Sequence, residues 1–186
     1  EVMSLGGYHV PAMRWGARLG HAEMTDMMLG ALYDPFGLGH MGITAENVAK
    51  DFNVTRAEMD AFALASQKRA ANAIEKGYFK DQITPVKITK KREEFAFDTD
   101  EHVRGETTAD GLASLRPAFD KEGQVTAGNS SGINDGAAAL ILGNAEKVEK
   151  SNKSPLAKIV SYGFGGVAPR ITVSYTHLTL PTIVRV

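Results

Sequence analysis

The residues best suited to binding chemistry in this sequence lie in one block, residues 125–142. The first half is small and polar, with Gly128, Gly132 and Gly136 at intervals of four, and residues 137–142 are continuously apolar. Glycine lets a backbone approach a ligand closely, and a polar turn before a buried element can hold a binding loop on a rigid support. The block therefore predicts such a loop, followed by a strand or short helix buried on both faces. A loop and core strand without a ligand fit the spacing equally well.

Three other segments could carry chemistry. His40 lies in a glycine-flanked loop before Thr44, a favourable helix N-cap, and by itself it suits a structural histidine. The acidic residues 98–101 and His102 lack the glycine and the distant Glu of a calcium loop, so no metal site is predicted there. Residues 163–166 lack the Lys and the spacing of a phosphate-binding loop, which leaves a turn as the better interpretation.

Composition excludes several classes of protein. The chain has 186 residues, 43% hydrophobic and 23% charged, which is ordinary for a globular domain. Lys and Arg number 21 against 22 Asp and Glu, so the net charge of −1 gives no basic field for nucleic acid. No apolar stretch reaches membrane-spanning length, which favours a cytoplasmic protein without a membrane partner. The sequence contains no cysteine, which excludes a disulfide scaffold.

Helices are predicted at four places, one of which begins at Thr44. Apolar residues at helical spacing predict one over residues 24–33 and a short one over residues 145–150. Thr55 and Glu58 form a capping box for a helix that should run to about Lys76 and stop at Gly77. Its predicted core face consists of Met59, Phe62, Ala63, Ser66, Ala70, Ala73 and Ile74. Arg56, at the start of the helix, is predicted to be solvated.

Strands are predicted over residues 82–87 and 93–98, around the basic turn 89–92, and over residues 157–162. Pro85 marks the first as an edge strand. The basic turn is predicted to be a solvated loop, which could help to neutralise phosphates if it faced a ligand.

Three ordered blocks of sequence carry a resemblance to a known family. Residues 126–139 resemble the TAGNxSGxNDGAAA block of thiolases, the acetyl-CoA acetyltransferase family. Residues 39–49 resemble the family's HMGxTAENVA segment, and residues 115–119 resemble its LRPAF. The similarity runs nearly continuously from Glu1 to about Pro169, so the chain is identified as a member of this family.

The resemblance implies an α/β fold of which the chain is an internal fragment. Residues 1–124 would form the loop domain, with CoA-binding and subunit contacts, and residues 125–150 the end of the N-terminal α/β lobe. Residues 151–170 would begin the C-terminal lobe. Residues 171–186 resemble the translation of a synthetic sequencing adapter, so this tail is predicted to be non-native and its His177 carries no functional weight.

The resemblance also implies a reaction. Thiolases condense two acetyl-CoA molecules to acetoacetyl-CoA and CoA, or run the reverse thiolysis, through an acyl-cysteine, in fatty acid and ketone metabolism. This chain has none of the cysteines required, nor the family's downstream Asn and His, so it is expected to supply the acyl-CoA groove and to be inactive alone. The alternatives are a non-catalytic acyl-CoA-binding or oligomerisation module, and a generic nucleotide-binding α/β domain.

Substrate contacts are implied at eight positions. The His40–Met41 pair is similar to that of thiolases handling acetyl and acetoacetyl groups, in which the Met narrows the acyl pocket and the His orders polar groups near the thioester. Contacts with the CoA carrier are implied for Leu32, Gln67, Arg104, Phe119, Ala127 and Ser131. Arg104 matches the position that holds the adenine-phosphate end of CoA, which a guanidinium suits. Ser131 matches a position that hydrogen-bonds a pantetheine amide. CoA is substrate and product. No other cofactor and no metal are implied, and a homodimer or homotetramer is expected.

Overall fold

The computed structural model describes residues 2–11 and 13–175. The chain divides into two compact units, one made of Glu1–Asp51 with Ile133–Val186 and the other of Phe52–Gly132. Residues 176–186, which hold most of the predicted adapter-derived tail and His177, lie outside the described residues.

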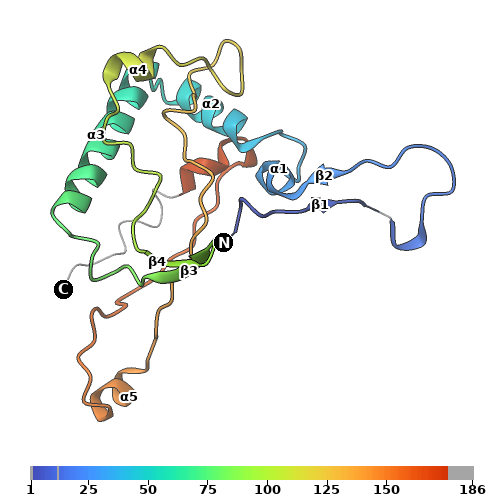
Figure 1. The fold of residues 1–186 in the computed structure, drawn as a ribbon. Helices are drawn as coiled ribbons and strands as arrows, with labels where there is room; N and C mark the ends of the chain where they lie inside the picture. Colours follow the sequence, from blue (N-terminus) through green and yellow to red (C-terminus); the bar gives the residue numbers. More distant parts are fainter. Residues whose placement is uncertain (1, 12, 176–186) are drawn as a thin grey trace. The chain divides into compact units, whose positions relative to one another are not determined.

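The first unit begins with a long excursion closed at its base by a short antiparallel pair of strands (Figure 1). Tyr8–His9 (β1) pairs with Thr25–Asp26 (β2), and between them lies the 3₁₀ turn Met13–Trp15 (η1). Helix α1 (Met27–Leu32) follows directly, because the Asp26 carboxylate accepts the Met28 N–H at 2.8 Å and caps the first turn. The predicted helix over residues 24–33 is confirmed. It begins three residues later because Thr25 and Asp26 belong to the strand pair and the cap.

Helix α2 (Met41–Asp51) starts earlier than predicted. His40 Nδ1 accepts the Gly42 N–H at 2.9 Å and takes the role expected of Thr44. The prediction of Thr44 as the N-cap is wrong, because Thr44 lies inside the helix and its hydroxyl donates to the Met41 carbonyl at 2.6 Å. A second segment, Pro169–Tyr175 (η2), packs along α2, where Arg170 donates to the Asp51 carboxylate at 2.6 Å.

The second unit is organised on the 20-residue helix α3 (Arg56–Glu75). The capping box is confirmed: the Thr55 N–H donates to Glu58 Oε2 at 2.8 Å, and the Glu58 N–H donates to the Thr55 hydroxyl at 3.3 Å. The predicted end is confirmed as well, since Lys76 is the C-cap and Gly77 has φ +70°.

The predicted core face of α3 is partly wrong. Phe62 is 74% exposed and Ser66 is exposed, whereas the buried residue of this helix is Asp60. Arg56, predicted to be solvated, is partly buried and pairs with Asp60. The buried side of the helix therefore includes this charged pair, because both side chains have hydrogen-bond partners on neighbouring segments.

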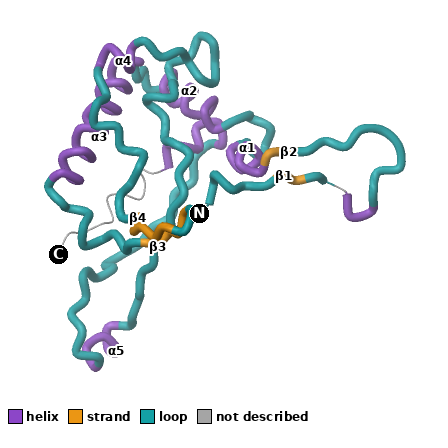
Figure 2. The backbone as a smooth tube through the Cα atoms, in the orientation of Figure 1, coloured by secondary structure: helices purple, strands orange, loops and turns teal. Residues whose placement is uncertain are grey.

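A β-hairpin follows α3 (Figure 2). Val86–Lys90 (β3) pairs antiparallel with Glu93–Phe97 (β4), with Val86 opposite Phe97 and Lys90 opposite Glu93. The predicted hairpin is confirmed, but its first strand spans residues 86–90 rather than 82–87, so Pro85 lies outside the strand. The predicted basic turn over residues 89–92 is too long, because Thr89 and Lys90 are paired in the hairpin. Lys91 and Arg92 both have positive φ, 51° and 75°, as the tight two-residue turn of a hairpin requires.

Helix α4 has five residues (Ala109–Ala113). The short helix α5 (Ala145–Lys150) confirms the predicted helix over residues 145–150. Between these two helices the chain forms no helix or strand (Figure 2). The predicted buried element over residues 137–142 is wrong, since Ile141 is 101% exposed. The predicted strand over residues 157–162 is also absent, and its side chains are exposed. A strand needs a neighbour to accept and donate its backbone hydrogen bonds. The described strands pair only within β1–β2 and β3–β4, so neither segment has such a neighbour.

Candidate functional site

Residues 124–130 of the second unit form a polar turn that is closed by hydrogen bonds between its own side chains and backbone. Thr126 is fully buried at 0% exposure, and its hydroxyl accepts the N–H groups of Gly128 at 3.2 Å and Asn129 at 3.3 Å. The Ser130 hydroxyl donates back to the Thr126 carbonyl at 2.6 Å. Small hydroxyl and amide side chains that bond nearby backbone groups are what close a tight turn of this kind.

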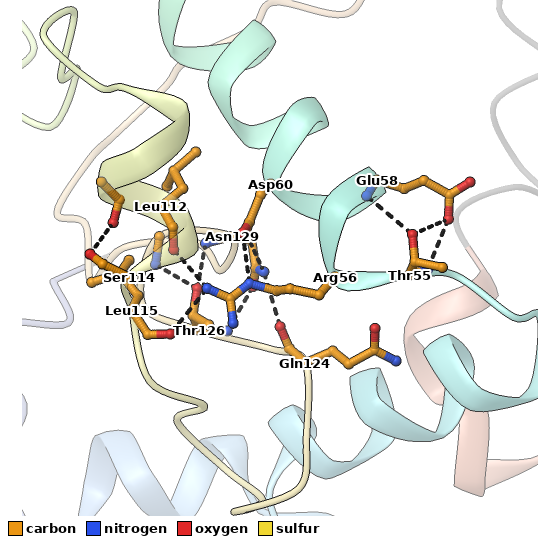
Figure 3. A network of polar contacts seen from close by, with 12 residues as sticks. Thr55, Arg56, Glu58, Asp60, Leu112, Ser114, Leu115, Gln124, Thr126 and Asn129 are labelled. Atoms are coloured by element: carbon orange, nitrogen blue, oxygen red, sulfur yellow. Dashed lines mark hydrogen bonds and ion pairs between the residues drawn. The ribbon is translucent and has the colours of Figure 1, made fainter.

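Asn129 ties this turn to helix α3 (Figure 3). Its Oδ1 accepts the Thr126 N–H at 2.7 Å, and its Nδ2 donates to Asp60 Oδ1 at 2.9 Å and to the Gln124 carbonyl at 3.1 Å. These bonds make Asn129 part of the hydrogen bonding that closes the turn. Because Asn129 also reaches α3, it crosslinks residues that are 69 positions apart.

Arg56 completes the network and joins a third segment to it. Its Nε donates to Asp60 Oδ2 at 2.7 Å, and its Nη2 donates to the carbonyls of Leu112 at 2.6 Å and Leu115 at 3.1 Å (Figure 3). The last carbonyls of α4 have no partner within their own helix, and a cation there is doubly favourable. One guanidinium therefore stabilises a buried carboxylate and the end of α4 together.

Helix α4 also contacts the turn through apolar side chains. A Cβ placed on Gly128 would come within 2.5 Å of Leu115 Cδ1 and 2.6 Å of Leu112 Cδ2. Only glycine fits such a close approach without displacing a neighbour. Polar contacts from α3 and apolar contacts from the α4 region thus hold residues 124–130.

Three predicted substrate contacts lie on or beside this turn. Ala127 and Ser131 are exposed, although the residues between and before them are anchored inward. Phe119 is also exposed and belongs to a segment that runs antiparallel to the turn, since Ala118 N–H donates to the Val125 carbonyl at 2.8 Å. The structure therefore brings these three predicted residues into one region of the second unit.

Two further predicted contacts also meet within this unit. The Arg104 N–H donates to Gln67 Oε1 on α3 at 2.8 Å, and the Arg104 carbonyl accepts from the Thr107 hydroxyl at 2.7 Å. The backbone of Arg104 is fixed on both sides while its residue as a whole is exposed. An exposed guanidinium on a fixed backbone is suited to bind a phosphate or an aromatic base.

The remaining predicted residues, Leu32, His40 and Met41, lie in the first unit, where α1 ends and α2 begins. The rings of Tyr33 and His40 meet edge to face with centroids 5.5 Å apart, and Asp34 closes the loop between them by accepting the Phe36 N–H at 2.7 Å. In the neutral form, an imidazole that accepts at Nδ1 carries its proton on Nε2 and can donate there.

Sequence reasoning missed Arg56 and Asp60. The signal for a helical pair was present, since opposite charges four residues apart face one another on a helix. Nothing in the local pattern indicated that the pair is turned inward, because its further partners are Leu112, Leu115 and Asn129.

Two carboxylates have lowered pKa values, both through hydrogen bonds. The backbone N–H of Thr55, and then its hydroxyl, lower the pKa of Glu58. The hydroxyl of Ser4, and then its backbone N–H, lower the pKa of Asp135, which lies in the same sequence block as the turn but in the first unit. Asp135 anchors a segment 131 residues away in the sequence. Hydrogen bonds to the charged form favour ionisation.

Within residues 2–11 and 13–175 no group of three His, Asp or Glu side chains is arranged to hold a metal ion. Over the same residues, none of the helices is both long enough and apolar enough to cross a membrane.

The chain is similar to members of one known family. Residues 1–146 match the sequence profile of the thiolase N-terminal domain. The chain is 54% identical over 171 residues to a beta-ketothiolase of Cupriavidus necator, covering 91% of this chain and 43% of that protein. It is 50% identical over 173 residues to an acetyl-CoA acetyltransferase of Pseudomonas aeruginosa, covering 92% and 44%.

Solved structures show the same similarity. An acetyl-CoA acetyltransferase of Bacillus anthracis matches with a TM-score of 0.89 at 45% identity, over 97% of this chain and 47% of that one. Human mitochondrial 3-ketoacyl-CoA thiolase in complex with CoA matches with a TM-score of 0.83 at 40% identity, over 91% and 42%. The chain belongs to the thiolase family and has part of the thiolase fold. It spans less than half the length of the relatives named here.

Proposed function

We propose that this chain is the acyl-CoA-binding part of a thiolase that transfers acetyl groups between CoA thioesters. The observation that carries the proposal is the turn at residues 124–130, which is anchored inward and leaves Ala127 and Ser131 exposed. A long carrier arm with two amides needs a smooth surface with a few fixed polar contacts. The similarity to a thiolase solved in complex with CoA supports the same proposal.

The reaction that follows from this proposal proceeds in two steps. A cysteine thiolate attacks the acyl carbon of the first thioester, the S–C bond to CoA breaks, and an acyl-cysteine forms while the CoA thiolate takes up a proton. The second acetyl-CoA then loses a proton from its methyl carbon to a base. The new C–C bond forms at the acyl carbon, and the cysteine thiolate leaves. This sequence contains no cysteine, so the thiols must come from polypeptide beyond these 186 residues.

Each unit has predicted substrate contacts of its own. In the second unit, Arg104 would bind the adenine-phosphate end, with Gln67 holding its backbone, and Ser131 would bind the pantetheine arm. In the first unit, Met41 would narrow the acyl pocket and His40, held at Nδ1 by the Gly42 N–H, would order polar groups near the thioester. The proposal uses CoA as substrate and product, needs no metal or other cofactor, and includes a cytoplasmic homodimer or homotetramer.

A second candidate function is a non-catalytic acyl-CoA-binding or oligomerisation module. The observation that favours it is the absence of cysteine from the sequence. The two candidates share the binding site and differ only in whether the site can support acyl transfer.

A binding measurement tests the feature common to both candidates. We expect the purified chain to bind CoA in isothermal titration calorimetry, and Arg104→Ala to weaken binding by about tenfold, the usual order for loss of a charge-assisted phosphate contact. Arg69→Ala, which removes an exposed cation from α3, is the matched control and should leave the affinity unchanged. Failure of the unaltered chain to bind CoA would contradict the proposed function.

An exchange experiment separates the enzyme from the module. Residues 2–169 replace the matching segment of the Cupriavidus necator beta-ketothiolase, and thiolysis of acetoacetyl-CoA is measured beside the unaltered chain. The exchanged protein should turn over, and the purified 186-residue chain should show no turnover because it has no thiol. An inactive exchange protein that still folds and binds CoA would favour the non-catalytic module.

A further inference from the structure

Asp60 is the buried group that the proposed reaction does not use. Only 8% of the residue is exposed, although a buried carboxylate is costly unless it is paired and hydrogen-bonded. Its two oxygens have separate partners: Oδ2 accepts from Arg56 Nε at 2.7 Å and Oδ1 accepts from Asn129 Nδ2 at 2.9 Å. Arg56 therefore orients the carboxylate, and the carboxylate orients Asn129.

The orientation of the Asn129 amide sets the conformation of the turn. An ionised carboxylate and a carbonyl can only accept, so Asp60 and Gln124 both require the Nδ2 end of the amide. The Oδ1 end must then point the other way, where it accepts the Thr126 N–H at 2.7 Å. The backbone at Thr126, one residue before Ala127, is thus determined from helix α3.

We propose that Asp60, oriented by Arg56, is a positioning residue for CoA binding. Through Asn129 it fixes residues 124–130 and so the places of Ala127 and Ser131 against the pantetheine arm. The inference rests on the proposed function, because it assumes that this surface receives the carrier. Asp60 touches no substrate in this account and acts through the turn alone.

The effect of Asp60 is confined to one end of the ligand. Arg104, proposed to bind the adenine-phosphate end, has its own anchors in Gln67 and Thr107. Loss of the Asp60 contact should weaken binding of the pantetheine arm and leave the binding of adenosine 3′,5′-bisphosphate, which lacks this arm, unchanged. General destabilisation of the unit would weaken both ligands.

The test is isothermal titration of the full 186-residue chain with CoA and with adenosine 3′,5′-bisphosphate. Asp60→Asn preserves the volume but places an NH₂ group against the donor of either Arg56 or Asn129. The dissociation constant for CoA should rise about tenfold, the order expected for one charged hydrogen bond, while that for the bisphosphate changes less than about twofold. Glu75→Gln, at an exposed acid on the same helix, should change neither.

Two further variants separate positioning from loss of structure. The exchange Asp60→Asn with Asn129→Asp restores a donor facing an acceptor at this contact but opposes the Gln124 carbonyl, so it should recover part of the lost CoA affinity. In a double-mutant cycle, Ser131→Ala combined with Asp60→Asn should weaken CoA binding no more than the stronger single variant, since both remove the same contact. Circular dichroism verifies that each variant retains the helical signal.

Each outcome decides between the proposals. Four results would overturn the positioning role and leave the proposed function standing. They are an unchanged CoA affinity in Asp60→Asn, an equal loss of affinity for CoA and the bisphosphate, no recovery of CoA affinity in the exchange variant, and additive effects in the double-mutant cycle. An unaltered chain that binds the bisphosphate but not CoA would overturn the proposed function itself, and the positioning role with it.

Discussion

In the block at residues 125–142, the polar half contains buried residues and the apolar half is exposed. In the polar half, Thr126 is fully buried and the turn is fixed by α3 and by the α4 region. In the apolar half, Leu140 and Ile141 are exposed and belong to no helix or strand. The hydrophobic effect favours the reverse arrangement.

The difference shows which contacts each half requires. The turn is held by hydrogen bonds within seven residues and by two other elements of its own unit. An apolar strand gains nothing until a second apolar surface covers it and a neighbouring strand pairs with its backbone. Burial in this chain therefore follows the availability of partners more closely than it follows hydrophobicity.

The largest effect on stability is expected when a buried valine and an exposed valine are each shortened to alanine. Val125, within the turn, is 6% exposed, and Val160 is 62% exposed. Val125→Ala should lower the free energy of unfolding by about 2 kcal/mol, from lost apolar burial and the cavity left behind. Val160→Ala should change it by less than about 0.5 kcal/mol. Urea unfolding of both variants measures the contrast, and equal losses would contradict the difference in packing.

A second pair compares two glycines of the same block. Neither Gly128 nor Gly136 has positive φ, so space rather than backbone conformation distinguishes them. An added methyl group meets Leu112 and Leu115 at Gly128 and nothing within 4 Å at Gly136. Gly128→Ala should cost about 1.5 kcal/mol of stability through overpacking, whereas Gly136→Ala should be close to neutral in thermal unfolding. A greater loss at Gly136 would show that the open half is packed after all.

The smallest effect concerns the start of α3, the helix that anchors the turn. Hydrogen bonds from Thr55 lower the pKa of Glu58, so the folded state prefers the ionised carboxylate. This stabilisation is fully present above the ordinary pKa of 4.5 and is lost as the pH falls through the lowered folded value. Glu58→Gln should therefore reduce stability slightly near pH 7 and flatten its decline below pH 4.5, measured by urea unfolding across pH. An unchanged acid profile would contradict the cap as a titrating contact.

Features determined by nearby residues could be predicted from the sequence. The capping box of α3, its stop at Gly77 and the β3–β4 hairpin all depend on contacts a few positions apart. The family was also accessible, because three long blocks keep their order along the chain.

Features determined by distant residues could not be predicted in this way. Arg56 was expected in solvent, since its further partners, Leu112 and Leu115, lie more than 50 positions away. The start of α2 was displaced because an imidazole took a role that propensity assigns to Thr44. For residues 137–142 the hydrophobic pattern indicated a buried element, but a pattern alone cannot supply the strand that would pair with it.

The contact of the Arg56 guanidinium with α4 also bears on the order in which the helices of this unit unfold. A five-residue helix such as α4 is far below the length at which a helix persists by itself in water. Its Leu112 carbonyl accepts from the Arg56 side chain of α3 as well as from the Leu115 N–H, so its amides should exchange with deuterium no more slowly than those of the first turns of α3. Helix α4 should therefore unfold whenever the first turns of α3 unfold.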